Sequence, residues 1–313
     1  MWTTIRDRLL ASIPLLLVVT LLSFVLNSLS PSDLARTILG AEGTKDQYLA
    51  LRQDMGLDRP ILVQYGAWLG QALLGDLGYS FFTKERVTEL LNARLGVTLS
   101  IMAGVMLVCV TAGLLLGVMS ALRGGWVGRA IDVLSLAGLM LPSFFVALLF
   151  ISIFAVWLRW LPATGYTMFS ESPRAWAMGL LLPILSVSLL PIANIAKQTR
   201  DGMNDVLRRD FIRSLRASGI SERSIIWKHA LRNAALPVVT VLGLVMVGAI
   251  SGTVFVERVF VLPGLGSLAV NAAQQSDMAV LQGAVLYFGL LAVAINLLVD
   301  LSYGWLNPRV RVT

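Results

Sequence analysis

The residues of this chain that could do chemistry with a partner are the basic side chains of one polar segment, 197–237, KQTRDGMNDVLRRDFIRSLRASGISERSIIWKHALRNAALP. In this segment nine Lys or Arg residues oppose four Asp or Glu residues, and two long apolar stretches flank it. These side chains could recognise a partner electrostatically, because a compact basic segment beside apolar stretches presents a charged surface. A plain solvated loop, held on one side of a membrane by its charge, is the simpler alternative.

Patterns for catalysis and metal binding are absent from the sequence. It contains no G-x-x-x-x-G-K-[ST], no H-E-x-x-H and no C-x-x-C motif. The single histidine, His229, lies in the basic segment without a ligand cluster, and the single cysteine, Cys109, lies in an apolar stretch. We therefore expect a non-catalytic protein with no cofactor or metal site, in which Cys109 is a buried small hydrophobic residue.

Two helices that meet at a glycine are predicted to hold the basic segment. Apolar residues recur at every fourth position of the first helix and predict one helical face: Met203, Leu207, Phe211 and Leu215. Gly219 is expected to end that helix, because glycine can take the left-handed conformation. Ser221 then caps the second helix, which runs into Leu236-Pro237, and Glu222 lies in its first turn, where the helix dipole favours an anion.

The composition indicates a membrane protein. The chain has 313 residues, 57% of them hydrophobic and 14% charged, with a mean hydropathy of +0.78. About 20 largely apolar residues are needed for a helix to cross a bilayer. We expect an all-α membrane protein with six spans, at residues 9–29, 97–121, 133–158, 176–196, 236–256 and 279–305.

The short loops predict the orientation of these spans. One side carries 15 Lys or Arg residues, nine of them in the basic segment, and the short loops of the other side carry three. Cytoplasmic loops are the more basic ones, so both termini are expected in the cytoplasm. The long segment 31–96 is then expected outside.

Small residues and prolines within the spans predict how the helices pack. Gly113-x-x-x-Gly117 and Gly248-x-x-x-Gly252 would let two helix backbones approach closely. Proline residues that should kink or loosen their spans lie at Pro142, Pro183 and Pro191.

The basic segment resembles the cytoplasmic "EAA" loop of ABC importer permeases in its peptide-transporter form, DFIRSLRASGISERSIIWKHALRNAALPVVTVLG. The resemblance extends over nearly the whole chain, including LRQDMGLDRPILVQYGAWLGQALLGDLGYSF and VFVERVFVLPGLGSLAVNAAQQSD. Where the general loop has Glu-Ala-Ala, this sequence has Arg213, Ser214 and Leu215, and it keeps Gly219. The sequence is similar to the B-type permease subunit of dipeptide/oligopeptide (peptide/nickel) importers.

This resemblance implies a type I ABC importer permease fold in a bacterial or archaeal plasma (inner) membrane. It implies an N-terminal helix in residues 1–30, the extracytoplasmic segment 31–96, a five-helix core in 97–305 and a cytoplasmic tail in 306–313. The implied partners are a second homologous permease subunit, two ABC ATPases that carry ATP and Mg, and an extracytoplasmic substrate-binding protein, with no nucleic acid. The basic segment would be the coupling helix, with ATPase contacts at Asp210, Phe211, Arg213, Arg216, Ala217, Gly219 and Ile220.

A second site is expected on the external face, in residues 257–266, ERVFVLPGLG. We expect this loop to fold back at the outer mouth of the pathway, as a gate or a contact for the binding protein; a plain turn is the alternative. The residues concerned are Glu257, Phe260, Pro263, Gly264, Leu265 and Gly266.

The substrate class that the resemblance implies is di- and oligopeptides. Nickel chelates, glutathione, opines or some oligosaccharides are alternatives for the same architecture. A self-contained channel or secondary transporter fits less well, because the spans contain few ionisable residues and the basic segment would have no role. A membrane scaffold that moves no solute is a further alternative.

Overall fold

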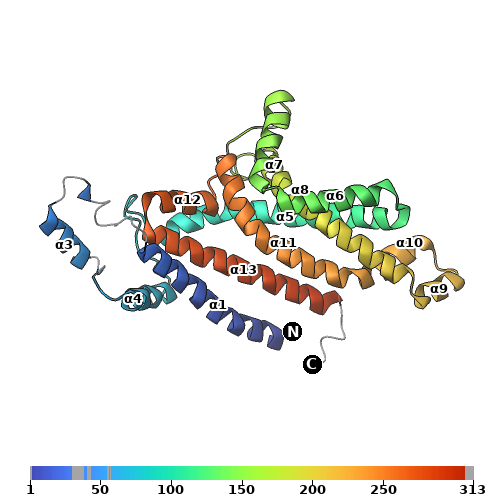
Figure 1. Cartoon of the computed structure of the whole chain (residues 1–313), viewed down its shortest axis with the longest axis horizontal. Coiled ribbons are helices and arrows are strands. Elements are labelled where there is room, and N and C mark those ends of the chain that lie inside the picture. Colours follow the sequence, from blue (N-terminus) through green and yellow to red (C-terminus); the bar gives the residue numbers. More distant parts are fainter. Residues whose placement is uncertain (1, 30–38, 41–43, 55, 57, 307–313) are drawn as a thin grey trace. The chain divides into compact units, whose positions relative to one another are not determined.

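A computed structural model describes residues 2–29, 39–40, 44–54, 56 and 58–306 of the chain (Figure 1). The chain divides into two compact units. The first unit contains Met1–Ile5, Leu99–Leu262 and Ala294–Thr313, and the second contains Arg6–Thr98 and Pro263–Val293. Arg309 and Arg311, two of the 15 basic residues counted on the side expected to be cytoplasmic, lie outside the described residues.

Helices account for the architecture, and the described residues contain no β-strand beyond one isolated bridge between Tyr79 and Arg86. In the part of the chain that the structure describes, five helical stretches are long and apolar enough to cross a membrane: Ile5–Ser28, Val87–Arg123, Pro173–Leu207, Glu222–Val259 and Met278–Tyr303. They belong to α1 (Trp2–Ser28), α5 (Val87–Arg123), α8 (Pro173–Leu207), α11 (Leu231–Val259, with the short elements that precede it) and α13 (Met278–Leu306). The predicted all-α membrane fold is confirmed.

The expected third span, residues 133–158, is not one helix. Helix α6 (Trp126–Met140) ends before Leu141-Pro142, and α7 (Ser143–Phe150) continues into a π-helical turn, η1 (Ile151–Trp157). Pro142 has ψ 143° and no backbone N–H, and a proline also disfavours helical geometry in the residue before it. The expected kink is therefore a complete break. In contrast, α8 continues through Pro183 and Pro191.

Within the first unit, α8 packs against α6, α7 and α11, and glycines of α5 let that helix approach α8. A Cβ atom at Gly113 would lie 2.6 Å from Ile195 Cγ2, and one at Gly117 would lie 2.4 Å from Thr199 Cβ. Such distances leave no room for a side chain. The close approach predicted for this glycine pair is confirmed, and Cys109, one turn earlier on α5, is buried as expected.

The second predicted glycine pair behaves differently. A Cβ atom at Gly248 would meet no atom within 4 Å. At Gly252 it would lie 3.3 Å from Ser143 Oγ. Of this pair, only Gly252 therefore lies close to other helices, α7 and, through Val187 Cγ1 at 3.6 Å, α8.

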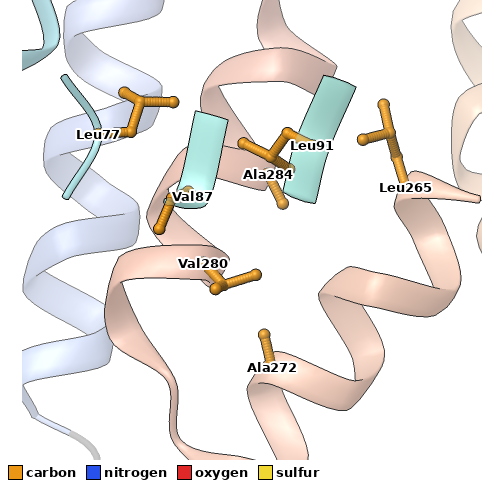
Figure 2. Close-up of a cluster of buried hydrophobic side chains, with 7 residues drawn as sticks. All are labelled: Leu77, Val87, Leu91, Leu265, Ala272, Val280 and Ala284. Carbon is orange, nitrogen blue, oxygen red and sulfur yellow. The ribbon is translucent and has the colours of Figure 1, made fainter. Parts of the chain in front are cut away.

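A cluster of buried apolar side chains holds the second unit together (Figure 2). It joins the start of α5 to α12 (Leu265–Gln275) and the start of α13, through Leu77, Val87, Leu91, Leu265, Ala272, Val280 and Ala284. Gly283 of α13 makes the approach possible, since a Cβ atom there would lie 2.8 Å from Val87 Cγ1. The same unit contains α3 (Lys45–Asp54) and α4 (Ile61–Leu73).

Buried polar contacts also connect distant segments of the second unit. Ser80 Oγ donates to Asp277 Oδ2 at 2.6 Å, and both side chains are buried. The Leu265 amide, which begins α12, donates to Thr98 Oγ1 at 2.9 Å. Such pairs satisfy polar groups that cannot reach water.

Candidate functional site

The basic segment forms a helical hairpin at the end of α8, as predicted, but its first arm is two helices. Helix α8 ends at Leu207, and the short helix α9 (Asp210–Ala217) begins after Arg209, which is extended with φ −71° and ψ 150°. Because of this break, the buried face of α9 does not continue the apolar positions of α8. Ile212 is fully buried, and Phe211 is 37% exposed. The predicted single apolar face through Phe211 is therefore wrong.

The corner after α9 has the hydrogen bonds of a Schellman motif. Gly219 has φ +74°, its amide donates to Arg216 O at 3.0 Å, and the Ile220 amide donates to Leu215 O at 3.2 Å. Leu215 and Ile220 pack against the same buried cluster, which supplies the apolar contact that usually accompanies this motif. The prediction that Gly219 ends the first helix of the hairpin is confirmed.

The second arm begins at Ser221, whose Oγ accepts from the Ser224 amide at 3.4 Å. It then runs without interruption through α10 (Glu222–Ser224), a π-helical turn η2 (Ile225–Ala230) and α11. Pro237 lies inside α11, so the second helix of the hairpin continues through Leu236-Pro237 into the membrane helix. The second arm is therefore a continuous extension of the membrane helix.

Apolar side chains on the inner side of the hairpin pack it against α8 and α5. The buried cluster consists of Val118, Met203, Val206, Ile212, Ile225, Ala230 and Ala234. It contains residues of both arms of the hairpin and of the membrane helices α5, α8 and α11. A rigid-body movement of the hairpin would therefore act directly on α5, α8 and α11.

An ion pair spans the corner of the hairpin. Arg216 Nε donates to Glu222 Oε1 at 2.6 Å, and Arg216 Nη2 donates to Glu222 Oε2 at 3.3 Å. The carboxylate raises the pKa of Arg216 above its ordinary value, mainly through this hydrogen bond. Arg213 pairs with Asp210 at 3.2 Å, with both side chains largely in solvent. These pairs fix the direction of exposed guanidinium groups.

The predicted ATPase-contact residues lie together on the outer surface of the hairpin. Six of them are exposed and Ile220 is half-buried; the exposed ones are Asp210, Phe211, Arg213, Arg216, Ala217 and Gly219. Next to them, a shallow hollow of about 380 Å³ is lined by Ser221, Arg223, Ser224 and Trp227. An exposed aromatic ring among oriented arginines is the composition expected for a protein contact. The ATPase-contact role itself stays a prediction.

A further ion pair, which the sequence did not predict, joins the root of the hairpin to α6. Arg200 Nη2 donates to Asp132 Oδ1 at 2.8 Å, and Arg200 Nη1 donates to Asp132 Oδ2 at 3.3 Å and to Gly128 O at 3.0 Å. The Arg200 hydrogen bonds lower the pKa of the Asp132 carboxyl. Because the partners are 68 residues apart, no local pattern could have indicated the pair.

The loop 257–266, expected on the external face, joins α11 to α12. Helix α11 ends at Val259, Val261 has φ +55°, and α12 begins at Leu265, after Pro263 and Gly264. A positive φ is strained for a β-branched residue. The side chains of Glu257, Phe260 and Leu265 are buried, and Gly266 is buried as well, so these residues do not offer an exposed surface to a binding protein. The role of this loop as a gate stays a prediction.

Comparison with known proteins identifies the family. Residues 113–312 match the binding-protein-dependent transport system inner membrane component, and residues 1–102 match the N-terminal region of such membrane components. The chain belongs to this permease family. The permease is 39% identical, over 99% of both chains, to a Brucella abortus protein provisionally named a peptide transport system permease protein. It is 38% identical, over 98% of both chains, to a Sinorhizobium fredii protein provisionally named a peptide ABC transporter permease protein.

A third relative carries a different substrate in its name. The glutathione transport system permease protein of Pectobacterium atrosepticum is 39% identical over 97% of both chains. Taken together, family and fold show that the permease is a multi-pass inner-membrane component of an ABC importer, as the resemblance implied. Such a component works with ATPase and binding-protein partners. A self-contained channel or secondary transporter is not favoured.

Proposed function

We propose that this permease imports di- or oligopeptides as one of two homologous membrane subunits that together form the translocation pathway. Two ATPase subunits carry ATP and Mg and supply the energy, and an extracytoplasmic binding protein delivers the peptide. Both termini and the basic hairpin face the cytoplasm. The peptide assignment rests on full-length relatives named for peptide transport.

The geometry of the hairpin supports the coupling role. Its outer surface offers Phe211 and oriented arginines to a groove of an ATPase, and its inner surface packs on three membrane helices. Closure of the ATPases would move the hairpin as a rigid body, and the continuous second arm would transmit that movement into α11. Nucleotide binding would thereby shift the balance between inward- and outward-open states.

Reconstitution in vesicles tests this proposal. The permease alone should take up no labelled dipeptide, with or without an ion gradient. Uptake should require the second permease, both ATPases, the binding protein and hydrolysable ATP. Gradient-driven uptake by the permease alone would refute the proposed mechanism.

Glutathione is the second candidate substrate, because one full-length relative is named for it. Competition separates the two. If peptides are the substrate, unlabelled dipeptides should suppress uptake of labelled dipeptide by the full assembly, and a similar concentration of glutathione should not. Efficient uptake of glutathione and none of dipeptides would overturn the peptide assignment and leave the coupling mechanism intact.

A further inference from the structure

Helix α4 of the second unit is an uncharged helix whose exposed face is mostly apolar, with Gln71 as an exposed polar side chain near its C-terminal end. Residues 61–74, ILVQYGAWLGQALL, contain no charged side chain. Large aliphatic side chains are strongly exposed on it: Leu62 at 69%, Val63 at 51%, Leu73 at 81% and Leu74 at 88%. Between them lie Gly66 and Gly70, where an added Cβ atom would meet nothing within 4 Å. In water this face would be unfavourable.

The inner face of α4 is fixed to α1 through Tyr65, which is 9% exposed. The Tyr65 hydroxyl lies 2.9 Å from Thr20 Oγ1 and donates to Leu17 O at 3.2 Å. Its ring packs edge-on against Phe24 at 5.8 Å between centroids. Gln282 of α13 donates to Thr20 O at 2.8 Å, so the same turn of α1 is held from two helices.

These contacts place α4 at the depth of the membrane interior. Along the span Ile5–Ser28, Leu17 and Thr20 lie about 17 and 12 Å from the Ser28 end and at least about 18 Å from the Ile5 end. The hydrocarbon core of a bilayer is about 30 Å thick. Tyr65 therefore meets α1 within the hydrocarbon region, whichever end of α1 is cytoplasmic.

We propose that α4 is embedded in the bilayer, with its outer face in contact with lipid acyl chains. The segment that follows the first span would then return into the membrane before the second span begins. This inference does not depend on the substrate of the permease.

The ends of α4 support a helix that enters the membrane and leaves on the same side. Its 13 residues extend about 20 Å, too short to cross the hydrocarbon core. Exposed charged residues stand on both sides of it, Asp58 and Arg59 before and Asp76 after. Gln64, near the first end, donates its side-chain amide to Arg59 O at 2.8 Å and so satisfies a polar group locally.

Continuity with α1 favours lipid over a protein partner as the occupant. Val18, Leu22 and Leu26 of α1 are exposed at 53%, 56% and 68%, and only 6% of the most apolar window of that span is buried. A helix packed against such a span extends the same apolar surface. The outer face of α4 offers no charge with which to orient a protein partner.

Site-directed spin labelling of the full chain in lipid nanodiscs tests the proposal. A Cys109→Ala background removes the native thiol, which is buried. Single cysteines then replace Val63 and Leu73 on α4, Leu22 on α1 as the lipid control, and Lys84, an exposed residue of the 80–86 turn, as the water control. Collision rates with oxygen and with a water-soluble nickel chelate report the surroundings of each label.

Labels at Val63 and Leu73 should behave like the label at Leu22. We expect their collision rate with the nickel chelate to be about tenfold below that at Lys84, because polar solutes are excluded from hydrocarbon, and oxygen collisions should be frequent. Nickel accessibility equal to that at Lys84 would overturn the proposal. A second result would also overturn the proposal. If the labels on α4 are accessible to the nickel chelate in the isolated permease but shielded from both reagents in the full transporter, a protein and not lipid covers α4.

Discussion

Arg200 of α8 and Asp132 of α6 form a two-pronged ion pair at the root of the basic hairpin, with Nη–Oδ distances of 2.8 and 3.3 Å. The same guanidinium also donates to Gly128 O at 3.0 Å. One side chain therefore ties the first turns of α6 to α8, the helix that leads into the basic hairpin. A planar guanidinium can bind a carboxylate and a carbonyl together in this way, whereas a lysine ammonium cannot reproduce the fork.

Replacing Arg200 should loosen this connection. Arg200→Lys keeps the charge and loses the fork, so transport should fall several-fold while ATP hydrolysis falls less. Proteolysis at the turn formed by Gly124 and Gly125, which joins α5 to α6, measures the loosening. Arg208→Lys, at an exposed arginine one residue beyond α8, is the control. Equal protection and transport in both variants would show that the pair does not position the hairpin.

A substitution at Gly219 tests backbone strain without a change in packing, because a Cβ atom there would meet nothing within 4 Å. Gly219→Val forces a β-branched residue to φ +74° and should cost about 1–3 kcal/mol at the corner. Gly219→Asn should be tolerated, since asparagine accepts this conformation more readily. We expect the valine variant to insert into membranes and to lose stimulation of ATP hydrolysis by the loaded binding protein. Wild-type coupling in the valine variant would remove support for the coupling assignment.

The local signals of this corner could be read from the sequence, because Gly219, Ser221 and Glu222 act through their immediate neighbours along the chain. The apolar residues at every fourth position predicted one continuous helical face, and this was wrong between Leu207 and Phe211. A periodic pattern does not reveal a break of two residues in a helix. A kink was expected at Pro142, but the sequence around a proline does not show whether the helix bends there or ends. Pro183 and Pro191 occur inside a continuous helix, which shows that proline alone does not determine the outcome.

Substitutions of the neighbouring residues Phe211 and Ile212 should affect different properties of the permease. Ile212→Ala removes a fully buried side chain and should destabilise the hairpin by about 2–5 kcal/mol, measured by loss of assembled transporter on heating. Phe211→Ala removes an exposed ring and should leave the permease stable. Its effect should be a roughly tenfold weaker association with the ATPases, about 1.4 kcal/mol. Normal ATPase affinity in Phe211→Ala would exclude the ring from the contact.

The approach of α5 to α8 should tolerate no side chain at Gly117. Gly117→Ala would place a Cβ atom 2.4 Å from Thr199 Cβ and 2.6 Å from Ala196 O, which requires the helices to separate. Overpacking of this kind costs about 1–3 kcal/mol, seen as a lower melting temperature in detergent. Gly248→Ala is the matched control, because nothing lies near that position. Equal melting temperatures would show that α5 and α8 are less closely packed than the distances indicate.

Substitution of Leu265 tests whether the loop 257–266 works as a gate. Its side chain is wholly buried, its amide is held by Thr98 Oγ1, and it lies in the apolar cluster of the second unit. If the loop moves during transport, a cysteine at Leu265 in a Cys109→Ala background should react with a water-soluble maleimide in one nucleotide state and be protected in the other. A cysteine at exposed Lys84 should react equally in the nucleotide-free and ATP-trapped transporter. Equal labelling of Leu265→Cys in both states would mean that the loop is a fixed part of the second unit's core, and the strained backbone at Val261 would then serve only to turn the chain between α11 and α12.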